Sequence, residues 1–329
     1  MHRGHADREP KEFSVTDVHL VFGTGAIGIA LIHELDEMGF RVRAVNRSGH
    51  ANVPNGVELI AGDASNGEFT AQAGKDATAV YQCLNPPYHQ WAKLFPPLQN
   101  GAVHAARTAN ARYVSFENTY MYGDTHGAPI TETTPLRAHT RKGKIRLAMA
   151  EQLRELHDNG ELSVATARAS DYFGPRATIQ SPLGDLVIGR ALGDRPAQVV
   201  GDPDQPHSYT FTRDAARTLA ALGTRDDVAG EVFHVPNAPA RTTREIIATI
   251  SDALAAPIRI SVAPRLVLRA IGLFTPAVRE LDEMRYEFTQ PFVVDSSRTE
   301  SRLGIEPTPL DEALAQTVSW FREQCSSTS

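Results

Sequence analysis

Three glycines with a fixed spacing near the start of the chain are the first residues that could do chemistry. Gly23, Gly25 and Gly28 follow the apolar residues 19–22 and precede a stretch whose apolar spacing predicts a helix over residues 29–38. A buried strand, a G-x-G-x-x-G turn and a helix form the arrangement that binds a dinucleotide. In that arrangement Gly23 allows the tight turn, Gly25 leaves room for the pyrophosphate, and Gly28 lets the helix approach the strand.

The start of the predicted helix supplies the binding groups. Its first backbone N–H groups and the positive end of its dipole would face the phosphates. A glycine-rich turn without a ligand is the alternative, and the strand before the turn and the helix after it favour binding. The expected contact residues of the turn are Gly23, Thr24, Gly25, Ala26, Ile27 and Gly28.

The end of the second predicted strand, residues 40–46, indicates which dinucleotide binds. NAD-specific proteins usually place an acid there to hold the ribose 2′-hydroxyl. This chain has Asn46, Arg47 and Ser48 instead. A carboxylate would repel a 2′-phosphate, whereas a guanidinium can pair with it through two hydrogen bonds. We therefore expect these three residues to favour NADP(H), with NAD(H) as the alternative cofactor and a solvated turn as the alternative structure.

The first half of the chain alternates strand and helix patterns. This alternation predicts a Rossmann-type α/β fold, with a doubly wound parallel sheet and helices on both faces. The further strands are expected over residues 57–61, 78–84, 111–116 and 163–168, and the clearest helices over 97–109 and 140–157.

The pattern changes after Pro175. Many prolines interrupt shorter elements, and helical stretches recur over residues 213–222, 243–254 and 310–323. We expect a flexible N-terminal tail over residues 1–16, a dinucleotide-binding domain over 17–175, and a smaller substrate-binding part over 176–329 that is partly interleaved with the first.

Composition narrows the classes of function. The 329 residues carry a formal charge of −6 and are 41% hydrophobic, which gives no reason to expect nucleic-acid binding. The two cysteines, Cys83 and Cys325, form no redox or ligand motif, and the chain has no apolar run that could span a membrane. We expect a cytoplasmic protein that binds no metal and acts on a small molecule, and a homodimer is left open.

Several segments together resemble the extended short-chain dehydrogenase/reductase family, also called the NAD-dependent epimerase/dehydratase family. Asp63 occupies the place of an acid that contacts the adenine in that family. Residues 113–123 resemble the fifth strand and its loop, and residues 168–175 resemble the segment after the sixth strand. The resemblance extends from the glycine turn to the last helix and implies the same fold.

The resemblance breaks down at the active-site helix. The family uses Y-x-x-x-K, in which the tyrosine transfers a proton and the lysine lowers its pKa and binds the nicotinamide ribose. Here Thr140 replaces the tyrosine and Lys144 takes the lysine position. Asn118 aligns with the hydroxyl residue that polarises the carbonyl, and an amide can still donate to an oxyanion. His207 replaces the arginine that holds phosphate in sugar-nucleotide enzymes.

Other residues near the expected nicotinamide are candidates with a structural alternative. Leu84 and Asn85 end the fourth strand and are expected to contact the cofactor. Tyr88 follows them and could supply the missing phenol or pack in the core, and Tyr120 could line the pocket or pack. Lys142 and its neighbour Arg141 are expected to be solvated.

These observations favour an NADP(H)-dependent oxidoreductase that reduces a carbonyl or an activated alkene of a small molecule. Two alternatives stay open. A sugar-nucleotide epimerase or dehydratase would need a base that the sequence does not show at the usual place. A non-catalytic NADP-sensing regulator would explain the loss of the tyrosine, but would not require Lys144.

Overall fold

Seven parallel strands form the central sheet in a computed structural model that describes residues 17–262 and 283–327. From edge to edge they follow the order β11-β6-β5-β4-β1-β2-β3, which confirms the predicted Rossmann-type sheet. The tail expected over residues 1–16 lies outside the described residues. The strands are β1 (Val18–Phe22), β2 (Arg41–Asn46), β3 (Glu58–Ala61), β4 (Ala77–Gln82), β5 (Arg112–Asn118), β6 (Ser163–Ala169) and β11 (Val232–His234).

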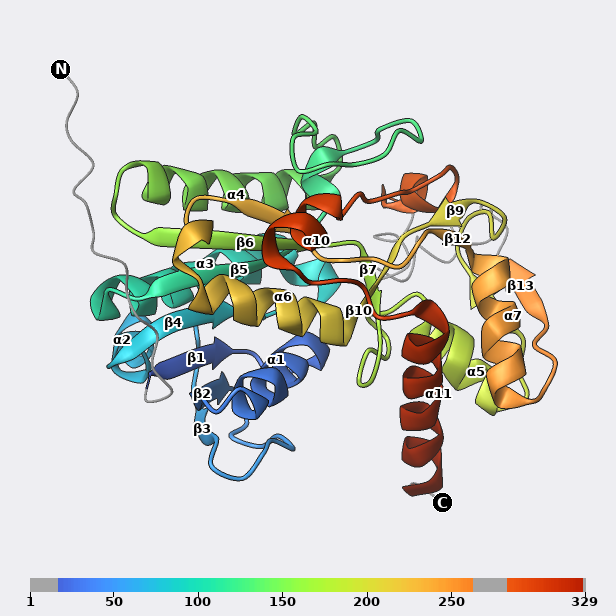
Figure 1. Ribbon diagram of the computed structural model, residues 1–329, viewed down its shortest axis with the longest axis horizontal. Coiled ribbons are helices and arrows are strands. Elements are labelled where there is room, and N and C mark those ends of the chain that lie inside the picture. Colours follow the sequence, from blue (N-terminus) through green and yellow to red (C-terminus); the bar gives the residue numbers. More distant parts are fainter. Residues whose placement is uncertain (1–16, 263–282, 328–329) are drawn as a thin grey trace.

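Helices cover both faces of this sheet (Figure 1). One face carries α1 (Ala26–Glu37) and α6 (Thr212–Thr224), which pack against each other. The other face carries α2 (Gly67–Ala73), α3 (Trp91–Ala109) and α4 (Arg141–Asp158). Because both faces are covered, the central strands β1 and β4 are almost wholly buried rather than alternating between buried and exposed residues.

The side chains of strand β1 pack in two hydrophobic cores, one on each face of the sheet. All five of its residues are buried. Val21 packs in the core under α1 and α6, whereas Leu20 and Phe22 pack in the core under α2, α3 and α4. The direction of strand order reverses between β1 and β4, and ligands of such sheets bind at this point, outside the carboxyl ends of the strands.

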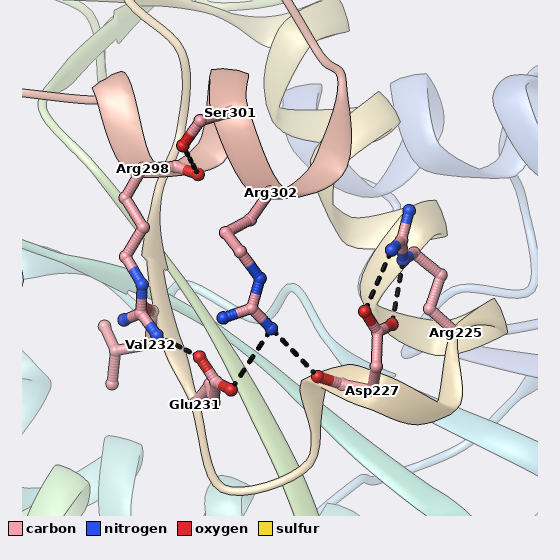
Figure 2. Close-up of polar contacts among 7 residues, drawn as sticks. All are labelled: Arg225, Asp227, Glu231, Val232, Arg298, Ser301 and Arg302. Atoms are coloured by element: carbon pink, nitrogen blue, oxygen red, sulfur yellow. Dashed lines mark hydrogen bonds and ion pairs between the residues drawn. The ribbon is translucent and has the colours of Figure 1, made fainter.

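The chain beyond Pro175 returns to complete this first unit. Strand β11 pairs in parallel with β6, and α6 lies on α1. Helix α10 (Ser297–Leu303) is tied to the turn η4 (Asp226–Val228) and the start of β11. Figure 2 shows Glu231 between Arg298 and Arg302, with Arg302 also donating to the backbone carbonyl of Asp227 (3.4 Å).

A smaller unit with its own core lies at one end of the sheet (Figure 1). Side chains from its helices and strands, among them Phe211, Ile246 and Leu314, are buried together there. Its elements are β7 (Asp171–Phe173), η3 (Gly184–Gly189), α5 (Arg190–Leu192), β8 (Ala197–Val199), β9 (Pro206–His207), β10 (Tyr209–Phe211), β12 (Arg241–Thr242), α7 (Thr243–Leu254), β13 (Ile260–Val262) and α11 (Leu310–Ser327).

One segment connects the two units beside the carboxyl edge of the sheet. It contains the turn η5 (Arg285–Phe288) and continues to residue 294. It forms one isolated bridge between Phe292 and His207 and another between Val294 and Ile130. A sequence stretch far from the glycine turn therefore lies next to both the sheet and the smaller unit.

The described residues form neither a membrane-spanning helix nor a cluster of metal-binding side chains. No helix within residues 17–262 and 283–327 is long and apolar enough to cross a bilayer. In the same part of the chain, no group of three or more histidine, cysteine, aspartate or glutamate side chains is placed to bind a metal ion.

Candidate active site

A side chain at each of the three glycines of the turn would meet different surroundings. Gly23 has a φ of +103°, and a Cβ there would lie 2.8 Å from the carbonyl oxygen of Cys83. A Cβ at Gly28 would lie 1.9 Å from the carbonyl oxygen of Gly23, so only glycine lets α1 approach the strand so closely. At Gly25 the Cβ position has no described atom within 4 Å and faces open space.

The start of α1 is suited to an anion. Gly25 is the N-cap residue and offers no side-chain cap. The first intrahelical bond joins the N–H of Ile29 to the carbonyl of Gly25 (2.9 Å), so the preceding N–H groups have no partner within the helix. A diphosphate at this end would meet both these donors and the positive helix dipole. The residues at the turn therefore fit the pyrophosphate of a dinucleotide.

The end of β2 forms an ordered turn beside the glycine turn. The amide of Asn46 donates to the hydroxyl of Thr24 (2.8 Å) and accepts the backbone N–H of Gly49 (2.6 Å). The hydroxyl of Ser48 donates to the same Asn46 side chain (3.3 Å), and Arg47 is exposed. Asn46 thus fixes the loop that presents the Arg47 cation, and its own contact with the cofactor stays a prediction.

Asp63 lies at the next strand end and is exposed. Its pKa is lowered, mainly by hydrogen bonds from the backbone and hydroxyl of Ser65 and also by the positive charge of Arg47. The acid expected to contact adenine is therefore an ionised carboxylate close to Arg47.

At the carboxyl edge of β4 and β5, polar side chains gather around two tyrosines. Asn85 is exposed just after β4, and its side chain hydrogen-bonds with Tyr172. On β5 the Oδ1 atom of Asn118 accepts the backbone N–H of Tyr120 (3.3 Å), which orients its amide. Tyr88 in η1 (Tyr88–Gln90) and Tyr120 in η2 (Tyr120–Tyr122) join their hydroxyls in a hydrogen bond.

The aromatic rings under these hydroxyls form a packed cluster. The ring of Trp91 lies 4.9 Å from Tyr88 and 6.0 Å from Tyr120, and Phe95 lies 5.1 Å from Trp91, centroid to centroid. Burial raises the pKa of both tyrosines above the usual range, so each is a neutral phenol at physiological pH.

Helix α4 presents residues to this cluster that differ from the expected ones. Thr140 is the N-cap: its hydroxyl accepts the N–H of Gly143 (3.0 Å) and contacts the sulfur of Met284 (3.5 Å). The side chain of Lys144 is exposed. The role predicted for Lys144 at the nicotinamide ribose is not tested by this placement.

The expectation that Lys142 is solvated is wrong. Lys142 is only 2% exposed, and its Nζ lies 4.3 Å from the ring centroid of Tyr88 and 6.0 Å from that of Trp91. The physical reason is the helix register: the buried row is Lys142, Arg146, Met149 and Leu153, whereas Lys144 begins the exposed row. Arg141, by contrast, is exposed as expected.

A second set of site residues comes from the connecting segment and was not expected. Glu283 accepts the backbone N–H of Lys142 (2.7 Å) at the start of α4. Glu287 is 1% exposed, and burial and the nearby charge of Asp171 raise its pKa well above the usual range. No sequence motif marks either glutamate, because their position depends on a contact between residues more than 100 positions apart.

The imidazole of His207 is paired with the carboxylate of Asp171. Its Nε2 lies 3.0 Å from Oδ2 of Asp171. Its ring stacks on Phe288 (4.9 Å) and Phe292 (5.0 Å), and the residue is 3% exposed. The position at which the family resemblance implies a phosphate-holding arginine therefore carries a buried histidine that is paired with a partly exposed aspartate.

A protein-family model matches most of the chain. The model described as "NAD dependent epimerase/dehydratase family" matches residues 20–235, which is more than half of the chain. The chain belongs to this family. The predicted family resemblance is confirmed, and the matched region includes the glycine turn, both tyrosines and the whole of α4.

Two curated relatives of this family member are described as dTDP-glucose 4,6-dehydratases. The protein of Neisseria gonorrhoeae is 28% identical over 215 residues, covering 64% of this chain and 59% of the relative. That of Xanthomonas campestris pv. campestris (strain ATCC 33913) is 29% identical over 219 residues, covering 64% of this chain and 56% of the relative. The matched stretch thus spans less than two thirds of either relative.

Solved structures share the fold over nearly the whole chain. The epimerase Mth375 of Methanothermobacter thermautotrophicus has a TM-score of 0.79 at 18% identity and covers 95% of this chain and 94% of its own. A UDP-glucose 4-epimerase of Thermotoga maritima, solved with UDP-glucose, has a TM-score of 0.77 at 17% identity and covers 94% and 99%. DesIV of Streptomyces venezuelae, a dTDP-glucose 4,6-dehydratase with NAD and TYD bound, has a TM-score of 0.76 at 18% identity and covers 94% and 98%.

Proposed function

We propose that the protein is an NAD(P)-dependent enzyme that moves a hydride to and from a carbon of a sugar nucleotide, as an epimerase or a dehydratase. One observation carries the proposal: the open space at Gly25 and the Tyr88–Tyr120–Lys142 cluster both lie at the carboxyl edge of the sheet. The descriptions of the relatives as dTDP-glucose 4,6-dehydratases support this reading over a dedicated carbonyl or alkene reductase.

The dinucleotide would be held by residues of three strand ends. The turn from Gly23 to Gly28 would bind the pyrophosphate, and Asp63 would contact the adenine end. Leu84 and Asn85 would flank the nicotinamide, which supplies or accepts a hydride at C4 when bound. We propose a preference for NADP(H), because Arg47 stands exposed where NAD-specific proteins usually carry an acid.

The protein groups would act on the oxygen of the reacting carbon. The amide of Asn118 would donate a hydrogen bond to that oxygen, which carries growing negative charge when a ketone is reduced. A neutral phenol among the tyrosines would give or take the proton. Thr140 is engaged as a helix cap, so we do not assign it a proton in this reaction.

A second candidate is a reductase of a small carbonyl compound that carries no nucleotide. The specific observation in its favour is the His207–Asp171 pair, which gives a diphosphate no free cation at that position. A diphosphate would then need another cation from the protein, whereas a neutral substrate would not.

Product analysis would separate these functions. The purified protein would be incubated with dTDP-glucose or UDP-glucose and either NAD⁺ or NADP⁺, and the sugar followed by NMR for a keto product or an epimer. The same protein would be assayed for NADPH and NADH oxidation with ketones, aldehydes and enones. A modified sugar supports the proposal, and turnover confined to the carbonyl panel supports the second candidate. Tight dinucleotide binding with no turnover in either panel would overturn both and favour a sensor.

A further inference from the structure

Helix α4 places a buried positive charge beside the two tyrosines. The side chain that carries it is Lys142, which is 2% exposed. Its Nζ stands over the face of Tyr88, 4.3 Å from the ring centroid, and more remotely over Trp91. A cation in this position attracts the negative face of the ring and would attract a phenolate far more strongly.

The hydroxyls of Tyr88 and Tyr120 form a hydrogen bond, which gives a proton a path from one phenol to the other. Either hydroxyl can be the donor, because a phenol both donates and accepts. When Tyr120 donates, the hydrogen of Tyr88 points at another acceptor, and a substrate oxygen at the edge of β4 and β5 would be one.

We propose that Tyr88 is the proton-transfer residue of this site and that Lys142 is the cation that stabilises its phenolate. The inference rests on the proposed hydride-transfer function and names the groups that perform its proton step. The tyrosine of this couple comes from η1 and the lysine from α4, two elements that are separate in sequence. Helix α4 itself carries no tyrosine.

The step balances for the reduction of a ketone. The carbonyl carbon gains a hydride from the reduced nicotinamide dinucleotide, the π bond to oxygen breaks, and the oxygen takes the proton of Tyr88. The Tyr88 phenolate then recovers a proton from the Tyr120 hydroxyl, which is replenished from solvent. Oxidation of an alcohol follows the same path in reverse, with Tyr88 as the base.

The first experiment measures how the charge of Lys142 affects the ionisation of the phenol at position 88, without cofactor or substrate. Nitrotyrosine would be installed at position 88 of the full chain, and its ionisation followed by the visible absorbance of the nitrophenolate. Lys142→Met should raise the midpoint by roughly one to two pH units, because it removes an opposite charge close to the ring. Lys142→Arg should restore most of the shift.

A matched control uses an exposed lysine on the neighbouring helix. Lys93→Met should leave the nitrophenolate midpoint unchanged, because charges in water are strongly screened. Circular dichroism would show that every variant is folded. Equal midpoints for Lys142→Met and Lys93→Met would overturn the role of Lys142.

The second experiment uses single-turnover hydride transfer with whichever substrate the panels identify. Tyr88→Phe should slow the transfer by roughly 100-fold or more, the usual effect of losing a general acid, while NAD(P)H affinity stays unchanged. Tyr209→Phe is the matched control, because that buried tyrosine bonds Thr243 in the smaller unit.

The outcomes distinguish the inference from the function on which it rests. Wild-type turnover with a fully active Tyr88→Phe variant would overturn the role of Tyr88 alone. A wild-type protein that turns over no substrate would overturn the proposed function, and the proton-transfer role with it.

Discussion

At the scale of the single residue, Arg47 is the side chain on which the proposed preference for NADP(H) depends. It is exposed at the end of β2, on a loop that Asn46 holds in place. A charge-assisted bidentate contact with a 2′-phosphate contributes about 1.5–3 kcal/mol. We expect Arg47→Ala to weaken NADPH binding by roughly 10- to 100-fold and to leave NADH binding nearly unchanged, as measured by calorimetric titration.

The control for this prediction is the exposed arginine at the start of β2. Arg41 stands at the opposite end of β2, so Arg41→Ala should bind both cofactors like wild type. If the wild-type protein binds NADH and NADPH equally, Arg47 does not select the phosphate.

Two glycines of the same turn should respond in opposite ways to valine. At Gly25 the new side chain would enter open space where the pyrophosphate is expected, so the fold should survive and dinucleotide binding should be lost. At Gly28 the new side chain would collide with the carbonyl of Gly23, so Gly28→Val should lower stability by at least about 1–3 kcal/mol. Thermal unfolding and NAD(P)H titration of both variants check this; undiminished binding by Gly25→Val would mean that the phosphates bind elsewhere.

At the scale of the element, the start of α4 depends on the hydroxyl of Thr140. It caps the helix by accepting the N–H of Gly143, and the residue is 7% exposed. Thr140→Val keeps the shape and removes the acceptor, so the free energy of unfolding should fall by about 1 kcal/mol. Thr140→Ser should retain most of it in denaturant unfolding. A Thr140→Val variant of wild-type stability would contradict the capping role.

The inward face of α4 could have been predicted from the sequence. Met149 and Leu153 are apolar at helical spacing, and stepping back along the same face gives Arg146 and then Lys142. Alignment with the family motif pointed to Lys144 instead. Periodicity is the physical constraint here, because the helix must bury its apolar row whatever residue occupies the motif position.

The start of α3 shows the opposite case, in which packing overrides a local signal. Pro97 suggested a helix start, because proline is favoured in the first turn and costly further in. The helix in fact starts at Trp91 and continues through Pro96 and Pro97. Trp91 and Phe95 are both buried against α4, and this tertiary packing is absent from any local pattern.

At the scale of the whole molecule, the sheet and its glycine turn were predictable because both follow from local sequence. Alternating strand and helix patterns imply parallel strands, and parallel strands place their carboxyl ends at one edge. Glu283 and Glu287 were not predictable, because they reach that edge from a segment more than 100 residues away in sequence. A site assembled by long-range contacts keeps no spacing that the sequence could reveal.

One buried histidine should contribute a distinct component to the pH dependence of the stability of the whole molecule. His19 on β1 is fully buried; its Nδ1 lies 2.8 Å from the Tyr81 hydroxyl, and burial lowers its pKa to about 4 from about 6.5. Between these values the unfolded chain binds a proton that the folded protein does not, so this contribution is complete above pH 6.5 and is lost as the pH falls toward 4. The difference of about 2.5 between the two pKa values corresponds to about 3 kcal/mol in the free energy of unfolding.

Denaturant unfolding from pH 7 to pH 4 should show this decrease in wild type, whereas His19→Gln, which cannot titrate, should lack that component. Parallel pH profiles for the two proteins would mean that His19 is protonated equally in both states.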